Sequence, residues 1–74
     1  MSKKVNPAMP ALFSELRKRL ASTAARVEEA AGYLETEGQY SAIGTIAGIE
    51  EDLADIAALY GATMAIHRSS HGGG

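Results

Sequence analysis

The second half of the chain contains the stretch that decides the fold, residues 41–68, which read SAIGTIAGIEEDLADIAALYGATMAIHR. Apolar side chains recur there at alternating spacings of three and four residues, a pattern typical of one buried stripe along an α-helix. The stripe consists of Ile46, Ile49, Leu53, Ile56 and Tyr60. We therefore expect one helix over residues 42–68, with Ser41 as its N-terminal cap.

The face opposite this stripe carries small residues where a solvent-exposed helix normally carries Lys, Glu and Gln. Glycine inside a helix costs up to ~1 kcal/mol, and small side chains let another helix backbone approach closely. We expect this face to contact another polypeptide, either a second copy or a protein target; the alternative is an alanine-rich chain whose outer face is simply small. The expected interface residues are Gly44, Ala47, Gly48, Ala54, Ala58, Leu59, Gly61, Ala62 and Met64.

The first half of the chain contains a heptad pattern that matches the stripe in length. One row consists of Phe13, Leu20, Val27 and Leu34, and the interleaved row of Met9, Leu16, Thr23 and Ala30. Such a pattern predicts one helix whose two rows face a partner helix. Asn6 followed by Pro7 favours a helix start, and Gly38 favours a helix end. The first helix is therefore expected over residues 7–37.

The short connection between the two helices predicts antiparallel neighbours. The expected fold is all-α: a two-helix antiparallel hairpin that dimerises into a four-helix bundle. Folding back at residues 38–41 pairs residues whose numbers add up to about 79, which places Arg26 beside Asp52. Residues 1–6 are expected to be a flexible basic arm, residues 7–68 the hairpin domain, and residues 69–74 a disordered Ser/His/Gly tail.

Size and composition favour a small protein that associates. A chain of 74 residues without cysteine has little core of its own and no disulfide to compensate, so association is the usual way to bury more area. The sequence shows no signal peptide and no apolar stretch long enough to span a membrane. We expect a cytoplasmic location and no membrane partner.

Charge is distributed unevenly along the chain. Eight acidic residues and no Lys or Arg lie between Glu28 and Asp55, whereas all seven Lys and Arg residues lie outside that window. In a hairpin the turn end is then acidic and the open end basic. This polarity is consistent with a solvated surface, with an antiparallel dimer, or with recognition of a charged partner. A partner-binding tip is predicted at Tyr33, Glu37, Tyr40, Glu51 and Asp55, and an anion contact at Arg17, Arg19 and Arg68.

No known catalytic motif occurs in the sequence, and we expect neither an enzyme nor a cofactor. His67 and His71 have a helical spacing but lack a third ligand, so no metal site is predicted. Without a helix-turn-helix pattern, sequence-specific nucleic-acid binding is not expected.

The leading hypothesis is a small homodimeric regulator or inhibitor of a host protein, an anti-activator or adaptor of the kind that phages and other mobile elements encode. One alternative is an oligomer that binds a small anion or nucleotide at inter-subunit crevices. Another is a structural bundle without a regulated partner.

Overall fold

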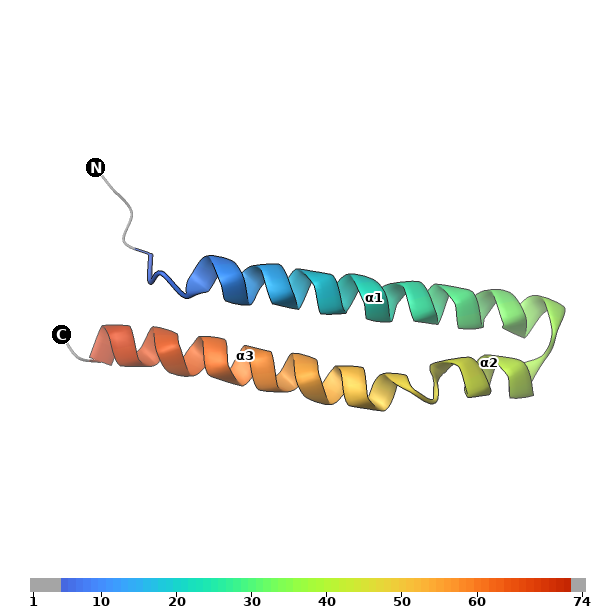
Figure 1. The fold of residues 1–74 in the computed structure, drawn as a ribbon. Coiled ribbons are helices and arrows are strands. Elements are labelled where there is room, and N and C mark those ends of the chain that lie inside the picture. The colour runs from blue at the N-terminus through green and yellow to red at the C-terminus, as the bar shows by residue number, and fades with distance from the viewer. Residues whose placement is uncertain (1–4, 73–74) are drawn as a thin grey trace.

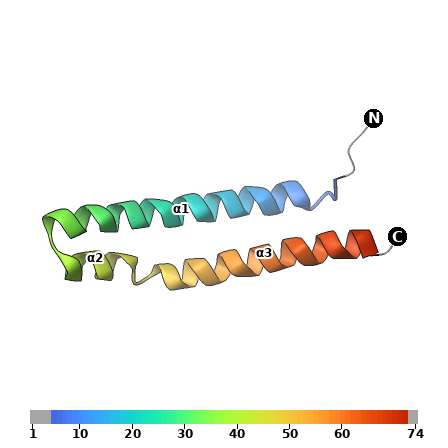
Figure 2. The same ribbon diagram turned by 180° about the vertical axis from the view of Figure 1, so that it is seen from behind.

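The structure, a computed structural model, describes residues 5–72 and forms three α-helices over them: α1 (Met9–Thr36), α2 (Gln39–Ile46) and α3 (Ile49–Gly72). Helix α1 is one arm of a hairpin, and α2 followed by α3 returns alongside it (Figures 1 and 2). The predicted all-α antiparallel hairpin is confirmed. It is a thin rod of 55 × 23 × 12 Å.

The turn between the arms depends on Gly38. Its φ of 107° and ψ of 178° belong to a region that essentially only glycine adopts. The N–H groups of Glu37 and Gly38 both donate to the carbonyl oxygen of Tyr33, at 2.7 and 2.8 Å, and so close the end of α1. Because α2 begins directly after Gly38, Ser41 lies inside that helix, and its predicted role as a cap is wrong.

The beginning of α1 uses Asn6, as the sequence suggests, although the helix starts at Met9 rather than at Pro7. The Asn6 side-chain Oδ1 accepts a hydrogen bond from the Ala8 N–H at 2.9 Å. The Asn6 carbonyl oxygen accepts one from the Met9 N–H at 2.9 Å. Asn6 therefore satisfies two amide groups that a helix start leaves without an intrahelical partner.

The returning arm is interrupted, so the prediction of one continuous helix over residues 42–68 is wrong. The break falls at Ala47 and Gly48. Gly48 and the nearby Gly44 both weaken a helix. A Cβ atom on Gly48 would lie 3.0 Å from Nη1 of Arg26, so this glycine makes room for a side chain of α1. Helix α3 also continues to Gly72, covering the first four residues of the expected tail. Residues 1–4 of the expected arm and residues 73–74 lie outside the described residues.

The two arms are paired about one helical turn away from the predicted register. Arg19 Nη1 lies 2.9 Å from Asp55 Oδ2, and Arg26 lies against Gly48. Both contacts join residues whose numbers add up to 74 (19 with 55, 26 with 48). The turn at Gly38 is tighter than expected, which shifts the returning arm. Among the described residues the ion pairs join Arg19 to Glu15 and Asp55, so Arg26 and Asp52, which the predicted register places side by side, form no ion pair.

The core between the arms is thin and made of small side chains. The buried members of the described chain are Thr23, Ala30, Ala42 and Thr63. Each buried threonine donates its hydroxyl to the carbonyl four residues earlier, Thr23 to Arg19 at 2.9 Å and Thr63 to Leu59 at 2.7 Å, so neither hydroxyl is left unsatisfied. The radius of gyration is 17.2 Å, whereas a compact domain of this length has about 11 Å. The hairpin therefore leaves much of its apolar surface uncovered.

Candidate interaction surfaces

Six large apolar side chains stand out because they are exposed although the sequence spaces them like core residues. We call this set the apolar face; its members are 44–61% exposed. They are Phe13, Leu20, Val27 and Leu34 of α1 and Leu53 and Tyr60 of α3. One row of the predicted heptad is therefore not in the contact between the arms.

The position of the apolar face follows from the residues that do lie between the arms. In α1 these less exposed residues include Leu16 and Thr23, and in α3 Ile56 and Thr63. Each member of the apolar face comes four residues, or in some cases one residue, after a residue that lies between the arms. Four residues rotate a side chain by about 40° about the helix axis, and one residue rotates it by about 100°. The rotation has the same sense in both helices. Because the arms are antiparallel, it turns both rows to the same side of the hairpin.

The opposite side of the hairpin is charged. On this side Arg19 forms ion pairs with two carboxylates. Its Nε lies 3.1 Å from Glu15 Oε2, and its Nη1 lies 2.9 Å from Asp55 Oδ2. All three side chains are substantially exposed, and exposed pairs of this kind contribute about 0–1 kcal/mol. A shallow hollow of about 260 Å³ beside this cluster is lined by Ala58, Leu59 and Ala62 as well. The hairpin thus has one apolar and one charged side.

The small-residue strip, the interface predicted along the returning arm, is exposed at most of its positions. Its exposed members are Gly44, Ala47, Gly48, Ala54, Ala58, Gly61 and Ala62. A Cβ atom on Gly44 or Gly61 would meet no atom of the chain within 4 Å, whereas one on Gly48 would meet Arg26. Leu59 and Met64 are only partly exposed. The strip therefore divides into positions open to an outside contact and positions used within the hairpin.

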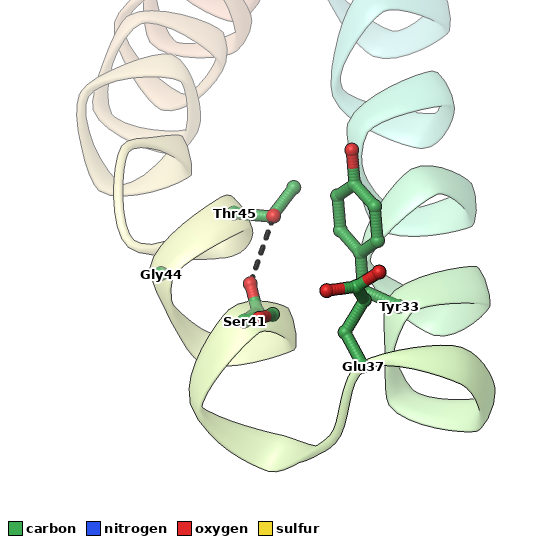
Figure 3. A pocket seen from close by; sticks show the side chains of 5 residues that line it. All are labelled: Tyr33, Glu37, Ser41, Gly44 and Thr45. Atoms are coloured by element: carbon green, nitrogen blue, oxygen red, sulfur yellow. Dashed lines mark hydrogen bonds between the residues drawn. The ribbon is translucent and has the colours of Figure 1, made fainter.

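A crevice opens at the turn end between α1 and α2. Tyr33 and Glu37 line it from the last turn of α1, and Ser41, Gly44 and Thr45 line it from α2. The crevice has a volume of about 460 Å³ and is open to solvent. Figure 3 shows the Tyr33 ring and the Glu37 carboxylate on one side of it, facing the residues of α2. The Thr45 hydroxyl donates to the Ser41 carbonyl oxygen at 2.9 Å, so that hydroxyl is already used.

Only part of the predicted tip lies at the turn. Tyr33 and Glu37 line the crevice, and Tyr40, in the first turn of α2, is 96% exposed. Glu51 and Asp55 lie on α3, beyond the break, and Asp55 is paired with Arg19. The contributions of Ser41 and Thr45 were missed because the sequence suggested a longer turn.

The three arginines of the predicted anion contact are not gathered into one site. Arg19 is engaged by two carboxylates, while Arg17 and Arg68 are exposed on different arms. In the observed register Arg17 lies level with residue 57, so Arg68 lies 11 residues, or about 16 Å, farther along the rod.

Comparison of the chain with family models, with curated proteins and with solved structures finds no match. Within the described residues, no helix is long and apolar enough to cross a lipid bilayer.

Proposed function

We propose that this chain is a homodimeric helical protein that regulates or inhibits a target protein by binding it, and that the target contacts the turn end. The observation that carries the proposal is the side chain of Tyr40, which is 96% exposed in the first turn of α2, at the turn end. Tyrosine is enriched at protein interfaces because its ring offers a large contact area at a low cost in side-chain entropy. Tyr33 lines the crevice at the same end of the rod, and two tyrosines at one end favour a recognition surface.

Charge supports a basic target. Eight acidic residues lie between Glu28 and Asp55 with no Lys or Arg among them, so this part of the chain attracts cationic partners. The Glu37 carboxylate points to the crevice (Figure 3) and forms no ion pair with any described residue. A Lys or Arg side chain of the target could pair with Glu37 and lie against the Tyr33 ring, where a cation–π contact contributes about 0.5–2 kcal/mol.

The test is affinity capture from a host lysate with three forms of the tagged chain. They are the wild type, the double variant Glu37→Gln/Tyr40→Ser at the turn end, and Arg68→Gln as a matched control at an exposed position towards the open end. We expect at least one protein that the wild type and the control retain and the double variant loses. The same set of captured proteins with all three forms would contradict a target contact at the turn end. Circular dichroism of each form checks that the hairpin is folded.

The anion-binding alternative gives a different result in calorimetry. Titration of inorganic phosphate or a nucleotide would then show binding that Arg17→Gln weakens. Our proposal expects no saturable binding of either compound by the wild type. Neither experiment depends on knowing the target.

A further inference from the structure

We infer that the apolar face is covered by the apolar face of a second copy, and that the two hairpins run antiparallel, with the turn end of one against the open end of the other. This inference rests on the homodimer in the proposed function. Self-association then uses the apolar face and not the small-residue strip.

The surface area of the chain supports a partner of this size. The accessible surface is 5804 Å², whereas a folded monomer of 7.7 kDa exposes about 4300 Å². The difference is at most about 1500 Å², an upper value because the total includes the chain ends. Obligate dimers bury about 1000–2500 Å² per subunit. Covering one long face with a second hairpin therefore brings the chain close to the surface of an ordinary folded protein.

The shape of the apolar face favours a second copy. Its members extend from Phe13, near the open end, to Leu34, near the turn, so the face follows the rod for most of its length. Only a partner equally long and equally apolar covers all of it. Another hairpin of the same sequence meets this requirement, and two identical faces pack about a two-fold axis. Leu20, Val27 and Leu53 then lie near the axis, in the middle of the interface.

Charge decides the orientation. With the hairpins antiparallel, Arg17 and Lys18 of one copy lie beside the turn half of the other, which carries Glu28 and Glu35. With the hairpins parallel, acidic halves would meet each other, and like charges at an interface are unfavourable. The antiparallel arrangement also places the two turn-end crevices at opposite ends of the bundle, about one rod length apart. A dimer built in this way presents two separate target sites.

Cysteine cross-linking tests the orientation directly, because the chain contains no cysteine. The single variants Phe13→Cys and Leu34→Cys are treated with a short thiol-reactive cross-linker, each alone and as an equimolar mixture. Along α1 these two positions are about 32 Å apart. In the antiparallel dimer, position 13 of one copy therefore lies near position 34 of the other and far from its own counterpart. We expect the mixture to give at least about ten times more cross-linked dimer than either variant alone. Efficient linking of Phe13→Cys to itself, or no link in any combination, would overturn the inference.

Light scattering separates this inference from the proposed function. The double variant Leu20→Gln/Leu53→Gln on the apolar face should weaken the dimer by at least about tenfold. The control Gly61→Leu, on the small-residue strip, should leave the dimer unchanged. Dissociation by Gly61→Leu and not by the double variant would overturn the inference and leave the homodimer intact. A monomeric wild type would overturn both, whereas an intact dimer that captures no target contradicts the proposed function alone.

Discussion

Replacement of Gly61 by alanine tests whether anything packs on the small-residue strip. Gly61 lies in the interior of α3, is exposed, and has no atom of the hairpin within 4 Å of the position where a Cβ would stand. Alanine in a helix interior is about 0.8–1.0 kcal/mol more favourable than glycine. The added methyl group is exposed to water, so burial adds almost nothing. We predict that Gly61→Ala stabilises each chain by about 1 kcal/mol.

Thermal unfolding followed by circular dichroism measures this gain. For a domain of this size, about 1 kcal/mol raises the Tm by about 4–8 °C. Protein concentration has to be the same for all forms, since the Tm of a dimer depends on it. The matched control is Gly32→Ala in α1, where a Cβ also has no atom within 4 Å. Both variants should move the Tm upward by similar amounts.

Opposite effects of the two variants on stability would contradict an open small-residue strip. A gain from Gly32→Ala together with a loss of about 1 kcal/mol or more from Gly61→Ala would mean that another backbone lies on the strip. The strip would then be the dimer interface. The apolar face would be left for the target, and our assignment of the two surfaces would be reversed.

Three further changes probe the hairpin itself, and a fourth tests the turn end. Gly38→Ala should lower the free energy of unfolding by about 1–3 kcal/mol, since its backbone region is nearly closed to other residues; an unchanged urea midpoint would contradict this. A double-mutant cycle with Arg19→Met and Asp55→Asn should give a coupling of about 0.2–1 kcal/mol that shrinks in about 1 M salt. Ala42→Leu should lower the free energy of unfolding by about 1–3 kcal/mol, because Ala42 is only 3% exposed, and calorimetry should show a lower Tm. Tyr40→Ser should change stability by no more than about 0.5 kcal/mol in the same experiment, so any loss of target binding reports on contact rather than on folding.

At the turn, the sequence predicts where the first helix ends but not where the next one begins. Glycine at residue 38 marks the end of a heptad pattern, and α1 does end just before it. The start of the next helix is not predictable in the same way, because serine favours a cap over a helix interior and yet Ser41 lies inside α2, which begins directly after Gly38. The early start of α2 shifts every contact between the arms by about one turn. Arg19 therefore meets Asp55, and Arg26 meets Gly48.

Only some residues of the candidate recognition site are predictable from the sequence. The sequence predicts Tyr33, Glu37 and Tyr40 at the turn because they flank its glycine. The α2 side of the crevice depends on the register of the returning arm, which no local pattern encodes. Glu51 lies about 13 residues beyond Gly38 along the returning arm, so the rise of the helix places it away from the turn whether or not the arm is broken.

By itself, the sequence determined that the chain forms two long amphipathic arms joined by a tight glycine turn, with the acids towards the turn. Periodicity specifies such stripes because residues three and four apart share one side of a helix. Only the tertiary structure decided which apolar row lies between the arms. Thr23 and Ala30 are small enough to let two helices approach, and their row faces the returning arm, whereas the row of Phe13, Leu20, Val27 and Leu34 is turned outward. The two rows lie about 40–60° apart on α1, so the pattern alone permits either rotation, and the packing of side-chain volumes selects one.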